Sequence, residues 1–134
     1  MASQMQLTQD IQTADWKSEK HVPVIECDDR VPKGEFFEVK VTIGKAVAHP
    51  NTTEHHIRWI TLYFRPESGK FTHQVGHFEF SSHGECTEGP NKGPVYTNHE
   101  ATVAMKTDQP GTLEALSYCN IHGLWQSTRK IQVE

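Results

Sequence analysis

Short runs of alternating apolar and polar residues constrain the fold of this chain more than any other feature. Successive side chains of a β-strand point to opposite faces of the sheet, so this alternation indicates strands that are buried on one face. The runs occupy residues 37–43, 59–64, 78–80, 101–105, 112–115 and 125–133.

The segments between these runs are rich in proline, glycine and asparagine, the residues typical of turns. They include 32–34, 49–51, 66–69, 89–91 and 109–111. We find no long helical face in the sequence. About seven short strands joined by turns predict an all-β protein, an immunoglobulin-like antiparallel β-sandwich.

The chain has 134 residues, which suits one domain with one core. Residues 1–12 are polar and are interpreted as an N-terminal tail, either a loose end or a subunit contact. Residues 13–134 form the predicted domain, in which 13–21 is expected to form a turn or a helical turn.

Charge and hydropathy exclude several classes of function. The net charge of −4 argues against a nucleic-acid partner, because a phosphate-binding face needs an excess of lysine and arginine. No apolar run approaches the roughly 20 residues of a membrane span. The first residues lack the pattern of a secretory signal, so we expect a cytoplasmic location.

Cysteine and histidine counts direct attention to metals. The three cysteines, Cys27, Cys86 and Cys119, are odd in number and widely spaced, and this does not indicate a disulfide framework. The nine histidines are an unusual number for 134 residues. Histidine is the commonest metal ligand among side chains.

Three clusters of possible ligands fall in predicted loops. The first is Glu19-Lys20-His21, the second runs from His49 to His56, and the third is Cys119-Asn120-Ile121-His122. Loops at one end of a sandwich converge in space. Each cluster alone also fits an ordinary alternative: solvated charges, a polar loop, or a buried cysteine beside a surface histidine.

The spacing within the clusters refines this expectation. Cys119 and His122 are three residues apart in a tight loop, where backbone N–H groups of Ile121 and His122 can donate to the sulfur. His55 and His56 are neighbours that face opposite ways in an extended chain, so only one of them is expected to bind. Several imidazoles with one thiolate suit iron or copper better than calcium or magnesium.

The three clusters, in this order, resemble the superoxide reductase family, also called neelaredoxin or the catalytic domain of desulfoferrodoxin. The matching motifs are E-K-H at 19–21, H-P-N-T-T-E-H-H-I at 49–57 and Y-C-N-I-H-G-L-W at 118–125. The similarity runs from about Ala14 to the C-terminus and also implies the immunoglobulin-like sandwich.

This resemblance implies a function and a set of ligands. The function is the one-electron reduction of superoxide to hydrogen peroxide at one mononuclear non-haem iron, in defence against oxidative stress. The implied iron ligands are four equatorial histidines and an axial cysteine, which fall on His21, His49, His55, His122 and Cys119. Glu19 matches the carboxylate that can occupy the sixth position, and Lys20 matches a lysine near the substrate.

The resemblance also implies partners. Longer relatives carry a rubredoxin-like domain with a second iron, for which this chain has neither a C-x-x-C motif nor room. The single-iron type implies a homotetramer that takes electrons from rubredoxin or a similar small donor. Cys27 and Cys86 match no ligand position and are expected to be structural.

Three alternative functions also fit parts of the sequence. A cupredoxin-like copper electron carrier is also a β-sandwich with a late cysteine and histidine, but its usual axial methionine is missing from 123–126. An immunoglobulin-like binding module would leave the histidines incidental. A dismutase would use the same substrate and evolve oxygen as well as peroxide.

Overall fold

The structure, a computed structural model, describes residues 4–134 and is built almost entirely of β-strands. The elements in chain order are α1 Leu7–Asp10, β1 Val24–Glu26, β2 Arg30–Val31, β3 Phe37–Thr42, β4 Ile57–Pro66, β5 His73–Glu79, β6 Glu100–Met105, β7 Gly111–Cys119 and β8 Gly123–Val133.

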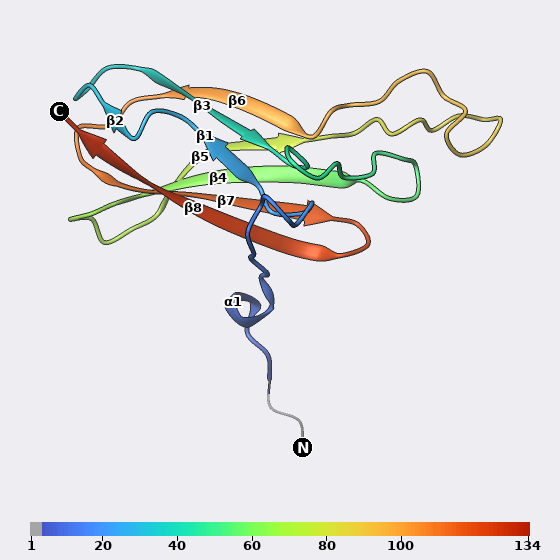
Figure 1. Cartoon of the computed structure of the whole chain (residues 1–134), viewed down its shortest axis with the longest axis horizontal. Helices are drawn as coiled ribbons and strands as arrows, with labels where there is room; N and C mark the ends of the chain where they lie inside the picture. Colours follow the sequence, from blue (N-terminus) through green and yellow to red (C-terminus); the bar gives the residue numbers. More distant parts are fainter. Residues whose placement is uncertain (1–3) are drawn as a thin grey trace.

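The strands form two sheets that lie one above the other (Figure 1). One sheet has the order β1-β3-β6 and the other the order β2-β8-β7-β4-β5. All neighbouring strands are antiparallel except β2 and β8, which are parallel. The predicted all-β sandwich is therefore confirmed, with eight strands in the described residues where about seven were expected.

Two short strands were missed by the sequence analysis, and a third begins earlier than expected. β1 and β2 have three and two residues, too few for an alternating pattern to be visible. β5 begins at His73, five residues before the first alternating residue. It lies at the edge of its sheet, beside a register shift between Leu62 and Tyr63 in β4, so its side chains are only partly buried.

The core lies between the sheets and fixes the direction of each side chain. Along β7, Leu113, Ala115, Ser117 and Cys119 are buried, and the residues between them are only half-buried. Because this alternation continues to the last residue of β7, Cys119 enters its turn with its side chain directed into the molecule.

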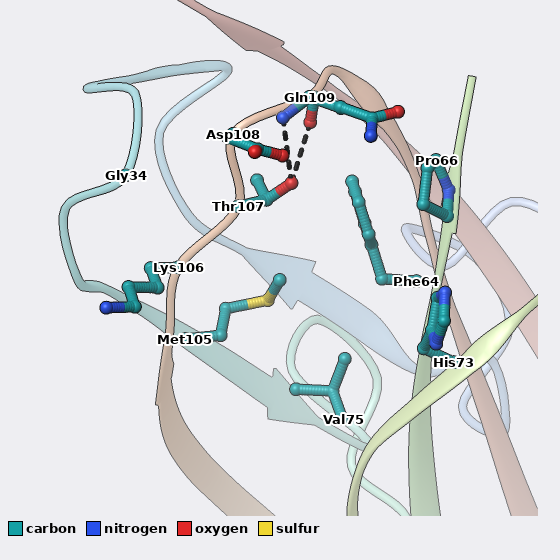
Figure 2. A pocket seen from close by; sticks show the side chains of 10 residues that line it. All are labelled: Gly34, Phe64, Pro66, His73, Val75, Met105, Lys106, Thr107, Asp108 and Gln109. Carbon is teal, nitrogen blue, oxygen red and sulfur yellow. Dashed lines mark hydrogen bonds between the residues drawn. The ribbon is translucent and has the colours of Figure 1, made fainter. Parts of the chain in front are cut away.

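The two ends of the sandwich differ in chemistry. β4 runs from Ile57, next to the histidine-rich loop, to Pro66, a distance of about 30 Å. A hollow of about 650 Å³ lies at the Pro66 end. Figure 2 shows Phe64, Val75 and Met105 around it, with the Thr107 hydroxyl bonded to Gln109 at its rim. It contains no cluster of thiol and imidazole groups.

The N-terminal segment projects from the sandwich (Figure 1). Residues 1–3 of the predicted tail lie outside the described residues. From there α1 leads to Gln12, whose backbone pairs with β8 next to Trp125. The expected turn within 13–21 is present, because the N–H groups of Ser18 and Glu19 donate to the Asp15 carbonyl. No helix in residues 4–134 is long and apolar enough to cross a membrane.

Candidate metal centre

The turn between β7 and β8 holds a thiol and an imidazole in close contact. Gly123 has a φ of 82°, a conformation that favours glycine and lets the chain reverse within a few residues. The His122 N–H donates to Cys119 Sγ at 3.4 Å, and His122 Nδ1 lies 3.9 Å from the same sulfur. The backbone N–H groups of Ile121 and His122 were both expected to donate to this sulfur, and the structure shows the bond from His122.

The loop before β4 supplies two more imidazoles. The rings of His49 and His55 meet edge to face at 4.8 Å between centroids. His56 faces the other way and stacks on His83 at 3.5 Å. The expectation that the neighbours His55 and His56 would point in opposite directions is confirmed.

Two hydrogen bonds tie this loop to the β7–β8 turn. The His56 N–H donates to Asn120 Oδ1 at 2.9 Å, and Asn120 Nδ2 donates to the Glu54 carbonyl at 2.8 Å. These bonds fix the separation of His55 from Cys119 and His122. Asn120 was not among the predicted site residues, although its place in the sequence between two candidate ligands was the available signal.

The segment before β1 brings the fourth imidazole. The carboxylate of Glu19 accepts hydrogen bonds from His21 Nδ1 at 2.6 Å and from the His21 N–H at 2.8 Å. With Nδ1 engaged, His21 presents Nε2, which lies 3.1 Å from His122 Nδ1. The His21 ring also contacts that of His49, at 4.8 Å between centroids.

These segments converge on one point. One ligand atom from each of His21, His55, Cys119 and His122 lies within 4.8 Å of the others. First-row metal ions bind such atoms at about 2.0–2.3 Å, so this spread is close to that of atoms sharing one ion. His49 is outside this compact set of four but packs its ring against those of His21 and His55.

Two unpaired nitrogen atoms indicate what kind of group the cluster can bind. His49 Nδ1 donates to the Pro50 carbonyl at 2.6 Å, which leaves Nε2 as a bare acceptor. The buried Nε2 atoms of His49 and His55 have no hydrogen-bond partner among the described residues. A buried polar atom without a partner is costly, and a bound cation would remove that cost. The residues therefore fit a metal.

Burial also holds these imidazoles in the neutral form that binds metals. It lowers the pKa of His49 to about 3 and lowers the pKa of His21 and His55. Glu19 moves the pKa of His21 in the opposite direction, but the effect of burial is larger.

Glu19 and Lys20 directly precede His21 in the chain. Both are half-buried. After burial and the neighbouring histidines, the charge of Lys20 also contributes to the lowered pKa of His21 and of His55. Burial tends to raise the pKa of Glu19, but the hydrogen bonds from His21 outweigh it and the pKa is lowered. Glu19 is therefore a carboxylate at neutral pH.

The other cysteines lie away from the cluster. Cys27 is half-buried and packs against the hydrophobic core, while Cys86 is exposed in the long loop between β5 and β6. Burial raises the pKa of the Cys27 thiol. The expectation that both are structural stays a prediction.

Fold and site together define a β-sandwich with a cluster of histidines and one cysteine that could hold a metal ion at one end. Residues 13–128 match the family model of desulfoferrodoxin. The chain belongs to the desulfoferrodoxin family.

Individual relatives agree with this assignment. The chain is 59% identical to the neelaredoxin of Megalodesulfovibrio gigas over 97% of this chain and 100% of the relative. It is 54% identical to the superoxide reductase of Pyrococcus furiosus over 90% of this chain and 95% of the relative. The reduced superoxide reductase (neelaredoxin) structure from Archaeoglobus fulgidus superposes with a TM-score of 0.86, at 53% identity, over 92% of this chain and 98% of that one.

These findings argue against two of the three alternative functions. The comparisons do not support a cupredoxin-like copper carrier, which would also leave His21 and His49 without a role. A binding module with incidental histidines does not explain why three imidazoles and a thiol from three segments lie within 4.8 Å of one another, with the ring of His49 packed against two of them.

Proposed function

We propose that this chain is a superoxide reductase that reduces superoxide to hydrogen peroxide at a single iron. The observation that carries this proposal is the convergence of a cysteine sulfur and four histidine rings from three segments of one sandwich. The names of the relatives that match nearly the whole chain support it.

The proposed ligands are His21, His49, His55, His122 and Cys119. His21 would bind through Nε2, because Glu19 engages its Nδ1. His49 would also use Nε2, because the Pro50 carbonyl engages its Nδ1. His122 would bind through Nδ1, the nitrogen that faces His21 and the sulfur. When bound, the iron supplies the electron for superoxide and a coordination position for it.

Cys119 and His122 are the two proposed ligands that lie nearest to each other in the sequence. The sulfur of Cys119 is completely buried and accepts a hydrogen bond from the His122 N–H. Such a bond favours the thiolate over the thiol and tunes how strongly the sulfur donates electron density. This pair would therefore set the reduction potential of the centre.

Lys20 is proposed to attract the substrate and to order a water that supplies one proton. Superoxide is an anion and the chain carries a net charge of −4, so any electrostatic steering must be local. Lys20 is half-buried and directly precedes His21 in the chain, so its ammonium is a suitable local charge. Superoxide needs one electron and two protons to become hydrogen peroxide, and a water ordered by Lys20 could deliver one of the protons.

Glu19 is proposed to have two roles. In the structure it accepts both hydrogen bonds from His21 and so fixes the tautomer and the orientation of that ring. The family resemblance implies the second role, in which the Glu19 carboxylate would also bind the iron. That role would require the carboxylate to turn away from His21.

An external donor must return the centre to its reduced form after each turnover. Rubredoxin or a similar small electron carrier, a homotetrameric assembly, a cytoplasmic location and a domain spanning 13–134 all stay predictions.

Iron content together with product analysis tests the proposed function. The reduced protein should contain about one iron per chain and should consume superoxide with formation of peroxide and no evolution of oxygen. Oxygen evolution in step with peroxide would indicate the dismutase alternative. Protein purified and reconstituted anaerobically that binds no iron would contradict the proposal.

A further inference from the structure

Trp125 connects two of the proposed ligands that are far apart in the sequence. It lies in β8, opposite Ser117 of β7, and it is only 8% exposed. Its indole ring stacks on the imidazole of His21, with 4.8 Å between centroids and 12° between the planes. Its Nε1–H donates to the His122 carbonyl at 3.3 Å.

The contact with His21 complements the one that Glu19 makes. Glu19 engages Nδ1 and so fixes which nitrogen of His21 is bare. A hydrogen bond to one atom still lets the ring tilt about that atom, whereas a stacked indole restricts the plane of the whole ring. Together the two side chains direct His21 Nε2 toward His122 Nδ1.

The contact with His122 acts on the backbone of the turn. The His122 carbonyl also accepts a hydrogen bond from Gln12 Nε2 at 3.1 Å. These two donors hold the peptide group that follows His122, next to the turn glycine Gly123. One large rigid side chain thus touches a ligand from the segment before β1 and the turn that carries another ligand.

We infer that Trp125 is a positioning residue for the metal centre, which sets the plane of the His21 ring and the distance from His21 to the β7–β8 turn. This inference rests on the proposed metal centre, but it concerns a residue that donates no ligand atom. Groups that orient metal ligands in this way commonly change metal affinity by about 10–100-fold when they are removed.

The test is the binding of Co²⁺, which gives visible bands without any enzymatic turnover. Trp125→Leu removes both the stack and the donor, and Trp125→Phe keeps a flat ring on His21 but removes the donor. We expect the dissociation constant for Co²⁺ to rise about 10–100-fold in Trp125→Leu and less in Trp125→Phe. The thiolate-to-Co²⁺ band should shift in both variants.

Ile131→Ala provides the matched control. Ile131 is completely buried in the same strand but lies at its far end, opposite Gly111. It should lower the stability of the metal-free protein, measured in urea, without moving the Co²⁺ band. This control separates a positioning role from general destabilisation.

The outcomes separate this inference from the proposed function. Wild-type affinity and spectrum in Trp125→Leu would overturn the inference and leave the metal centre in place. The same would follow if its changes were no larger than those of Ile131→Ala. If Trp125→Leu does not fold, Trp125→Phe decides, since a spectrum identical to wild type would overturn the inference. A wild-type protein that binds neither Co²⁺ nor Fe²⁺ would overturn both proposals.

Discussion

At the scale of single residues, the hydrogen-bond partners of the ring nitrogens show which imidazoles can bind a metal ion. His49 and His55 each bury an Nε2 atom without a hydrogen-bond partner, and His21 is held so that its Nε2 faces the cluster. His56 is as buried as His49, yet its Nδ1 is engaged by the Thr52 carbonyl and its ring stacks on His83. Burial alone therefore does not distinguish a candidate ligand, but the direction of the ring does.

Replacement of the thiolate is the most direct test of a single residue. Cys119→Ser should abolish reductase activity and the thiolate-to-iron band, because a neutral hydroxyl is a much weaker donor than a thiolate. The buried hydroxyl should also cost about 1–3 kcal/mol of stability. Cys86→Ser, in an exposed loop, is the control and should leave both activity and spectrum unchanged. Activity retained in a folded Cys119→Ser protein would disprove the role of the thiolate.

The charge of Lys20 should govern how fast superoxide is captured. A unit charge about 6 Å from the substrate contributes roughly 2–3 kcal/mol at an effective dielectric constant of 20. Lys20→Met should therefore slow the second-order reaction with superoxide by about one to two orders of magnitude and weaken its dependence on ionic strength. Lys17→Met, an exposed charge three residues away, is the comparison. An unchanged rate and salt profile in Lys20→Met would exclude steering by this residue.

Removal of the Glu19 carboxylate should separate its two proposed roles. Glu19→Ala should alter the spectrum of the ferric protein and leave the first reaction with superoxide fast, as rapid-mixing absorbance would record. Glu19→Gln retains an oxygen that can accept the hydrogen bonds of His21, so it should preserve metal affinity better than Glu19→Ala. Loss of the first reaction in Glu19→Ala would mean that the carboxylate is needed before the product leaves.

At the scale of elements, the β7–β8 hairpin is the part of the site whose geometry depends most on its own local sequence. The alternation along β7 turns Cys119 inward, and the turn at Gly123 returns the chain so that His122 lies beside the sulfur. The sequence indicated this pair correctly because three residues in a tight turn leave few arrangements. The loop 43–56 is different, because it is held by hydrogen bonds to Asn120 in another hairpin.

Two glycines make it possible to separate turn geometry from stability. Gly123 and Gly34 have φ of 82° and 72°, and a Cβ added at either would meet no atom within 4 Å. Alanine should therefore cost about 1 kcal/mol at each position through backbone strain alone. We expect Gly123→Ala also to weaken metal binding, measured by chelator competition, whereas Gly34→Ala should not. Equal metal affinities in the two variants would show that the turn does not depend on this glycine.

At the scale of the whole molecule, the sandwich separates its two ends. The loops at the Ile57 end of β4 carry the cluster of imidazoles and the thiol, whereas the hollow at the Pro66 end is lined by a single imidazole, that of His73, among apolar and polar side chains (Figures 1 and 2). The sheets between these ends are packed with aliphatic side chains, so the loops are held by a rigid body. Such a body can hold the imidazoles close together in neutral form, at a cost in stability that depends on pH.

The metal-free protein should lose stability as the pH falls below about 6.5. Burial lowers the pKa of His49 to about 3 and lowers that of His83 and His99, while the unfolded chain keeps values near 6.5. Below that pH the unfolded state binds more protons, so each such histidine costs up to about 1.4 kcal/mol per pH unit until its folded pKa is reached. Urea unfolding with a chelator present, between pH 8 and pH 5, measures this slope. Constant or rising stability on acidification would contradict it.

The sequence by itself determined the all-β class, six of the strands and the local pairing of Cys119 with His122, since these depend on side-chain alternation and short spacing. It also predicted that His55 and His56 point in opposite directions. Only the tertiary structure decided that His21, 101 residues before His122, brings its ring nitrogen within 3.1 Å of it. The same holds for the stacking of Trp125 on that ring. Such contacts arise from the packing of whole strands and loops. A local sequence pattern does not determine how two side chains that are about 100 residues apart are oriented toward each other.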